Sequence, residues 1–424
     1  MKRIFLVATL CMFAGFSFAQ KKAVKEAKSS KDINEARGLI KQAQTDPETA
    51  NDPETWKVAG DIEYKEFDDQ RTLEMQKEIT GKGGDEARMY TGLYNMYEPY
   101  AKADELAEQP DEKGKIKNKV RKDLAQRLKE AHRFYINGGV FYNDQKDYKK
   151  AADFFERYWE LPTLPMFAGT EDFNLQDTTY QTIKYYTVIS AIQSKDHPRS
   201  IKLLHKIIDE GYVPQTTYKE SDPYELLASE YQQKEDSLAY VNILRQGAEK
   251  FPTNKFFTPN LINEFIRGGK TAEAISYLDQ AIKNDPSSAC DLMSVKGTLF
   301  ADQKDYAKAE EAYKVAINAN ANCERSLEGI GVLYVLQAQD LKEKAGQTTN
   351  RREQAELDQG TADLYNKALP YLEKYRDILK GKNAEDYEIK AALKKLENVY
   401  YNLSLLNIDK SKELEAVQKE LGTI

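Results

Sequence analysis

The side chains that most often carry enzyme chemistry are few in this 424-residue sequence, and they form no recognisable catalytic motif. The histidines are His132, His197 and His205, and none belongs to an HExxH zinc motif or to a Cys/His cluster. No GxSxG nucleophile motif occurs, and the acidic residues are scattered, so no carboxylate pair of the kind used in glycoside hydrolysis stands out. A catalytic pair of one Cys and one His, distant in the sequence and brought together by folding, is an alternative that the sequence leaves open. We expect a protein that is not an enzyme and that uses no metal and no cofactor.

The net charge indicates the class of partner to expect, and the N-terminal sequence indicates the cellular location. The formal net charge is −7, which argues against nucleic acid as the main partner because nucleic-acid-binding domains present a basic face. Lys2 and Arg3, the apolar run 4–16 and Ala19 together follow the pattern of a secretory signal peptide over residues 1–19. A hydrophobic N-terminal helix of the fold is the alternative. Cys11 is a weak candidate for lipid attachment because Leu10, not a small residue, precedes it.

Small and aromatic residues recur at fixed spacing and indicate stacked helix pairs. One segment carries the series Gly297, Phe300, Ala309, Tyr313, Ala316, and an earlier one repeats the same offsets with Gly139, Tyr142, Ala151, Phe155, Tyr158. The turn inside each segment has the same letters, DQKDY. Gly331 follows Gly297 by 34 residues, a period typical of helix–turn–helix repeats. A glycine lets two helices approach closely, and the aromatic ring fills the space beside it.

With these motifs the chain resembles the tetratricopeptide repeat (TPR) family over roughly residues 32–421. The resemblance implies an all-α fold, a right-handed TPR α-solenoid of helix–turn–helix repeats with two helical insertions. It also implies binding of proteins or peptides without a catalytic motif. The export pattern and the insertions are similar to those of envelope TPR proteins of Gram-negative Bacteroidota.

The period and its interruptions predict how the chain is divided. Residues 68–131 break the repeat, and we expect Met89–Ala107 to be the displaced partner helix of the unit that begins at Trp56. About 25 residues are inserted after Gly331, which predicts two lengthened helices in a hairpin. The expected parts are a signal peptide (1–19), a mobile leader (20–31), N-terminal TPR-like helices with an insertion (32–131), TPR repeats (132–336), a helical insertion (337–361) and C-terminal TPR helices with a polar cap (362–424).

Cys290 and Cys323 fall at the two ends of one repeat. Neighbouring packed helices lie about 8–10 Å apart, whereas a disulfide needs Cα atoms within about 7 Å. We therefore expect two separate thiols, although export to an oxidising compartment leaves a disulfide possible.

In the TPR family the first helices of the repeats line a concave groove, so the resemblance gives candidate binding residues. The Lys and Asn pair with which some TPR proteins hold a C-terminal carboxylate is absent; only Asn263 matches. Arg267 and Arg325 could instead pair with a carboxylate in bidentate fashion. The alternative is that these are ordinary solvated or internally paired residues. The candidates for groove binding are Phe256, Asn263, Arg267, Thr298, Asp302, Arg325 and Glu328, with Ser294 on the same face.

The expected function is a non-enzymatic exported TPR scaffold that mediates protein–protein interaction in the bacterial cell envelope, in the periplasm or at the outer membrane. The expected partner is a protein or peptide. The alternative is an envelope protein that captures a glycan or peptide through a surface rich in tyrosine, of which the chain has 27. The sequence leaves the oligomeric state open.

Overall fold

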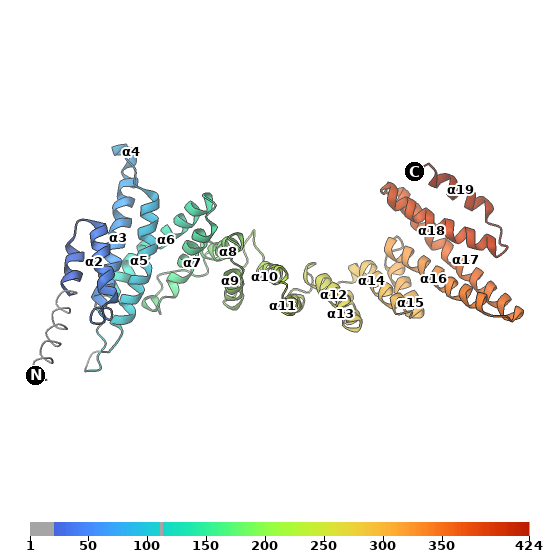
Figure 1. Cartoon of the computed structure of the whole chain (residues 1–424), viewed down its shortest axis with the longest axis horizontal. Coiled ribbons are helices and arrows are strands. Elements are labelled where there is room, and N and C mark those ends of the chain that lie inside the picture. The colour runs from blue at the N-terminus through green and yellow to red at the C-terminus, as the bar shows by residue number, and fades with distance from the viewer. Residues whose placement is uncertain (1–20, 111–112, 424) are drawn as a thin grey trace, which may run out of the picture. The chain divides into compact units, whose positions relative to one another are not determined.

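The computed structural model describes residues 21–110 and 113–423, and in this part of the chain every regular element is a helix (Figure 1). The expected signal peptide and Cys11 lie outside the described residues. The chain divides into two compact units, Met1–Asp236 and Ser237–Ile424. The boundary falls between the two helices of one expected repeat.

In the described part of unit 1, residues 21–29 form a helix in place of the expected mobile leader. Val24 and Ala27 of this helix belong to one buried cluster with Ile40 and Val58, and Ala23 is also buried. Small apolar residues at i, i+1 and i+4 make only a narrow stripe on the helix. The charged residues around it make this stripe hard to recognise in the sequence.

Most of the remaining helices of unit 1 pack on the long helix that precedes or follows them in the chain. They are α2 (Ile33–Thr45), α3 (Pro53–Met75), α4 (Lys77–Thr80), α5 (Glu86–Ala107), α6 (Arg121–Asp144), α7 (Tyr148–Glu160), the short 3-10 turns η1 (Leu161–Thr163) and η2 (Pro165–Phe167), α8 (Thr178–Gln193), α9 (His197–Asp209) and α10 (Asp222–Gln233). The predicted pairing of Met89–Ala107 with the Trp56 unit is confirmed. In that pair Tyr100 of α5 packs on Gly60 of α3, and its hydroxyl donates a hydrogen bond of 3.0 Å to Asp61.

Unit 2 continues the array of helix pairs. Its helices are α11 (Ser237–Lys250), α12 (Phe257–Arg267), α13 (Thr271–Asn284), the 3-10 turn η3 (Pro286–Ser288), α14 (Ala289–Asp302), α15 (Tyr306–Ala319), α16 (Glu324–Gln347), α17 (Arg351–Gly381), α18 (Asp386–Leu405) and α19 (Ser411–Leu421). The predicted hairpin of two lengthened helices is confirmed in α16 and α17, which pack together along their length and are joined by residues 348–350.

The repeated glycines and rings meet as the sequence predicts. A Cβ atom placed on Gly139 would lie 2.2 Å from the Phe155 ring, and one on Gly297 would lie 2.5 Å from the Tyr313 ring. At Gly331 the partner is Leu372, at 2.6 Å. Each glycine therefore lets the second helix of its own pair press a large side chain against the backbone of the first.

The two DQKDY turns also have the same geometry. Lys146 and Lys304 adopt left-handed backbone conformations, with φ of 61° and 59°. Asp147 and Asp305 then cap α7 and α15, their carboxylates accepting hydrogen bonds from the backbone N–H groups three residues later. The sequence repeat is thus a structural repeat.

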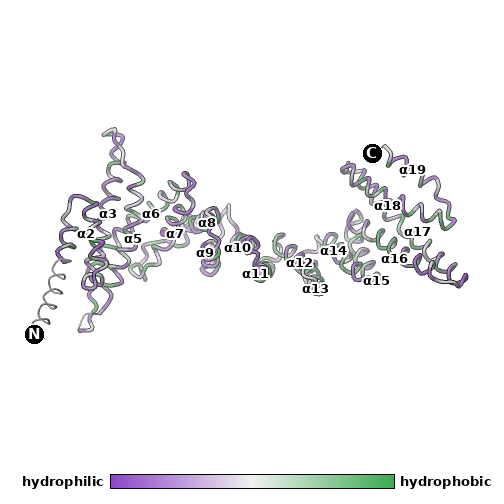
Figure 2. Tube along the Cα trace, in the orientation of Figure 1, coloured by the Kyte–Doolittle hydropathy of each residue, from purple (hydrophilic) through white to green (hydrophobic). Residues whose placement is uncertain are grey.

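Hydrophobic residues alternate with polar ones along each helix (Figure 2). Within the described residues no helix is both long enough and apolar enough to cross a membrane.

Replacing Gly297 by leucine should destabilise unit 2 by about 3 kcal/mol or more, because the new side chain overlaps the buried Tyr313 ring. Gly346→Leu in α16 is the matched control, since nothing lies within 4 Å of the added Cβ there. Urea denaturation of both variants measures the difference. Equal midpoints for Gly297→Leu and the wild type would contradict the close-packing account.

His132 of α6 is a buried neutral histidine in unit 1. Its ring stacks on Tyr158 at a centroid distance of 3.9 Å and meets the edge of Phe173 at 4.7 Å. Its Nε2 lies 2.8 Å from the Tyr158 carbonyl oxygen, so the N–H is on Nε2. Burial lowers the pKa of His132 to about 4, with the hydrogen bond to the carbonyl acting weakly in the opposite direction.

This pKa predicts acid sensitivity of unit 1. Because the unfolded His132 has a pKa near 6.5, the unfolded state binds the extra proton first, and stability falls as the pH drops from 6.5 towards 4. From pH 7.5 to 5 the loss should be about 2 kcal/mol. Denaturation at several pH values should show this slope in the wild type and a shallower slope in His132→Gln. Identical slopes would contradict the assignment.

Candidate functional site

Four of the seven candidate residues come together on α14 and α16, around the hydroxyl of Tyr313. The Tyr313 ring, from α15, passes between Gly297 of α14 and Gly329 of α16, where added Cβ atoms would lie 2.5 and 2.6 Å from it. Its hydroxyl is 3.2 Å from the Thr298 hydroxyl. Burial raises the pKa of Tyr313; nearby Asp302 and Glu328 add to this shift, whereas Thr298 and Arg325 oppose it.

These four residues differ in how open they are to a partner. Thr298, Asp302 and Arg325 are exposed. Glu328 is half-buried and forms an ion pair with Lys395 of α18, whose Nζ lies 3.1 Å from the Glu328 Oε1. The exposed Arg325 guanidinium is therefore the strongest polar anchor of this group, since arginine is enriched among residues that dominate binding energy.

The other three candidates lie on α12 or directly before it, one repeat earlier. Phe256 is half-buried and packs its ring edge-on against Phe257 at 5.3 Å. Asn263 is exposed, and Arg267, at the end of α12, pairs with Glu264 at 2.6 Å. Bidentate pairing of Arg267 or Arg325 with the carboxylate of a partner stays a prediction.

Ser294 is not a surface residue, which corrects its placement on the groove face. It is 2% exposed, and its hydroxyl is 2.6 Å from that of Ser326, also buried. Serine is small enough to sit where α14 and α16 come closest, and the hydrogen bond to Ser326 satisfies its polar group there.

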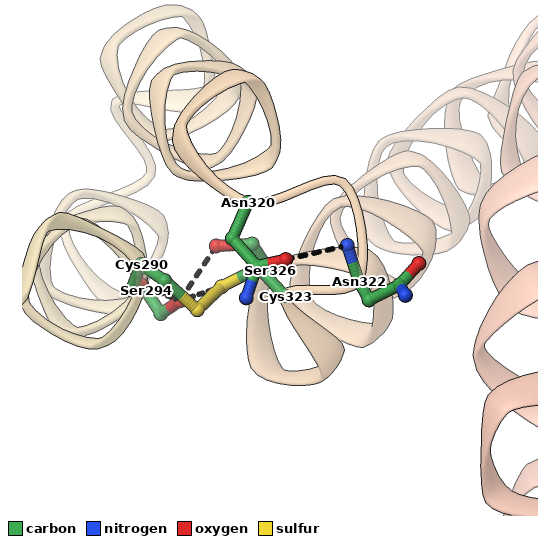
Figure 3. Close-up of a disulfide and its surroundings, with 6 residues drawn as sticks. All are labelled: Cys290, Ser294, Asn320, Asn322, Cys323 and Ser326. Carbon is green, nitrogen blue, oxygen red and sulfur yellow. Dashed lines mark hydrogen bonds between the residues drawn. A yellow bond between two sulfur atoms is a disulfide. The ribbon is translucent and has the colours of Figure 1, made fainter. Parts of the chain in front are cut away.

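A disulfide joins Cys290, in the first turn of α14, to Cys323, which precedes α16 (Figure 3). The two Cα atoms are 5.7 Å apart, so the expectation of two separate thiols is wrong. That expectation used the spacing between helix axes. Because Cα atoms lie about 2.3 Å from the axis, residues that face each other come about 4–5 Å closer than the axes do.

Sequence reasoning missed an exposed stripe on α18. Tyr387, Tyr401 and Leu405 are 72%, 52% and 55% exposed. They belong to the series 387, 391, 394, 398, 401, 405, whose alternating steps of four and three place it on one face of a helix. The terminal helix pair was expected to be a polar cap, and only α19 fits that description. The 3.6-residue periodicity was visible in the sequence, but not which face would be left uncovered.

The Glu328–Lys395 ion pair links α18 to α16, and α16 itself packs on α14. We call a set of exposed and half-buried residues on these three first helices the α14–α16–α18 surface. Its members are Thr298, Asp302, Arg325, Glu328, Leu336, Tyr387, Tyr401 and Leu405. Across the described residues no group of His, Cys, Asp and Glu is arranged to hold a metal ion.

Removing the disulfide should destabilise unit 2. Cys290 and Cys323 are 33 residues apart, and closing a loop of that length stabilises a fold by about 3–4 kcal/mol through the unfolded state. A Cys290→Ser, Cys323→Ser variant and the wild type in reductant should therefore melt at the same lowered temperature. A melting temperature that reductant leaves unchanged would contradict the bridge.

Comparison with known families agrees with this architecture over part of unit 2. Residues 260–322, which run from α12 to the loop before α16, match the family model described as tetratricopeptide repeat. No curated protein sequence matches the chain.

Three solved structures show the range of similarity. The C-terminal part of a TPR repeat-containing protein from Cytophaga hutchinsonii is 16% identical, with 68% of this chain and 93% of that chain covered and a TM-score of 0.42. A TPR repeats protein from Bacteroides fragilis is 17% identical, with coverages of 62% and 95% and a TM-score of 0.33. A tetratricopeptide repeat protein from Parabacteroides merdae is 12% identical, with coverages of 56% and 97% and a TM-score of 0.30. The protein is an all-helical array of TPR-like repeats.

Proposed function

We propose that this protein is an exported, non-enzymatic scaffold that binds another protein of the bacterial cell envelope through the α14–α16–α18 surface. The observation that carries the proposal is the set of exposed anchors, Arg325, Tyr387 and Tyr401, on neighbouring first helices. Tyrosine and arginine dominate binding energy at protein interfaces because each buries a large area and offers directed hydrogen bonds.

The surface is also held in place before any partner arrives. The Cys290–Cys323 disulfide ties α14 to α16, and the Glu328–Lys395 pair ties α16 to α18. Side chains presented by rigid elements lose less conformational freedom on binding, which favours affinity. A mixed surface of aromatic, aliphatic and charged groups suits a folded protein or an ordered peptide segment as the partner.

Two features support export. The disulfide is of a kind that persists in oxidising compartments such as the periplasm. Residues 1–19 have the sequence pattern of a secretory signal. The absence of catalytic motifs in the sequence, and the match to a repeat family that generally binds proteins, support a scaffold without enzymatic activity.

The test is crosslinking and co-purification of the tagged protein from the envelope fraction of its own cells, with identification of the partner by mass spectrometry. Arg325→Glu combined with Tyr401→Ala should reduce recovery of a stoichiometric partner at least tenfold, since loss of two anchors removes about 2–4 kcal/mol of binding free energy. The intact mass of the protein should correspond to a chain that begins at Gln20 and contains one disulfide.

Arg352→Glu is the matched control, because Arg352 is an arginine of the same unit whose side chain is 89% exposed near the tip of the α16–α17 hairpin. If only this control lost the partner, binding would belong to the inserted hairpin. If neither variant lost it, or if the protein stayed unprocessed in the cytoplasm, the proposal would be overturned.

A further inference from the structure

A separate cleft of about 210 Å³ lies in unit 1, between α5 and α7. Its lining residues are Thr91, Tyr94 and Asn95 of α5, Tyr142 of α6, and Lys150, Asp153 and Phe154 of α7. The cleft belongs to unit 1 and shares no residue with the α14–α16–α18 surface of unit 2, so the two are separate candidate sites.

Three aromatic rings line this cleft and are fixed by packing. Phe154 lies 5.5 Å from Tyr94 and 5.3 Å from Tyr142, measured between ring centroids. Phe154 is 3% exposed and Tyr142 is 7% exposed. Gly138 of α6 permits this arrangement, because a Cβ atom there would lie 2.5 Å from the Phe154 ring. The rings thus form a preorganised wall rather than a set of mobile side chains.

Hydrogen-bonding groups lie among these rings, and several of them can form further hydrogen bonds. Within the described residues, neither the Asn95 amide nor the Tyr142 hydroxyl is hydrogen-bonded to another residue. Asp153 is bound to Arg199 through one carboxylate oxygen, at 2.6 Å. The Lys150 ammonium lies 4.8 Å above the Tyr142 ring and 3.3 Å from Asp147. Lys150 and Asp153 supply one positive and one negative charge, so the lining carries no net charge.

We propose that this cleft binds one ring of a neutral saccharide. A pyranose ring presents a face of C–H groups, which packs favourably on the electron-rich face of an aromatic ring, and the half-buried Tyr94 is the ring of the wall that can offer such a face. The edge of the pyranose carries hydroxyls that both donate and accept, as the lining amide, hydroxyl, carboxylate and ammonium groups require. The volume is below the roughly 300–1,000 Å³ of pockets for drug-sized ligands, which limits the occupant to about one ring.

Other occupants fit the lining less well. A purely apolar side chain would cover Asn95 and the Tyr142 hydroxyl without giving them partners, and each such loss costs about 1–3 kcal/mol. A charged ligand would gain little, because Lys150 and Asp153 offset each other. The proposal does not depend on the protein-binding function, so either can fail alone.

The test is saturation-transfer NMR on the purified full chain with glucose, galactose, mannose and N-acetylglucosamine, each alone. At least one should receive saturation at its ring C–H protons. Tyr94→Ala should abolish the transfer. Tyr142→Phe keeps the ring and loses the hydroxyl, and it should weaken binding about fivefold. Tyr186→Ala is the matched control, a partly exposed tyrosine of α8 in the same unit that does not line the cleft.

Thermal unfolding of each variant shows whether it is folded. If Tyr94→Ala unfolds, Asn95→Ala replaces it, because Asn95 is exposed and its loss leaves the ring wall intact. Absence of transfer to all four sugars, or transfer unchanged in the cleft variants, would overturn the proposal. Tighter binding of N-acetylphenylalanine amide than of any sugar at the same residues would also overturn it and assign the cleft to a peptide side chain.

Discussion

The structure depends on one contact that recurs in both units, a glycine of one helix pressed against a large side chain of its neighbour. Gly60 meets Tyr100, Gly139 meets Phe155, Gly297 meets Tyr313 and Gly331 meets Leu372. In each case a single methyl group on the glycine would occupy space that the neighbour already fills. Because protein interiors are packed at crystal-like density, the pair cannot move apart by a small amount without losing many contacts at once. This constraint sets the spacing within these four helix pairs.

The same constraint brings the candidate surface together. Tyr313 touches glycines of two successive first helices, Gly297 and Gly329, so α14 and α16 approach each other across its ring. The close approach requires small side chains at the start of the two helices, which Ser294 and Ser326 provide. It also brings Cys290 and Cys323 within bonding distance. The disulfide is thus a consequence of the packing that positions Thr298, Asp302 and Arg325 on the outer side.

Tyrosine serves two purposes in this chain. In unit 1 most rings are buried, and Tyr97, Tyr100 and Tyr135 fill the spaces between helices. Where a ring lines a cleft, as Tyr94 and Tyr142 do, the same stiffness creates a fixed wall for a ligand. On α18 the rings of Tyr387 and Tyr401 face outward instead. The position of a tyrosine relative to the next helix, rather than its abundance, decides which purpose it serves.

The sequence alone determined the repeat, the helix pairs, the lengthened α16–α17 hairpin and the partner of the Trp56 helix, because periodic spacing of small and large residues dictates which helix faces can meet. It also predicted one binding groove for all seven candidates, among them Thr298, Arg325 and Glu328, and that stays a prediction. Only the tertiary structure decided that Cys290 and Cys323 form a disulfide and that Ser294 is buried. It also decided that residues 21–29 pack as a helix and that Arg267 forms an ion pair with Glu264. These outcomes depend on distances of a few ångströms between residues of different helices, and a one-dimensional pattern carries the order of residues but not those distances.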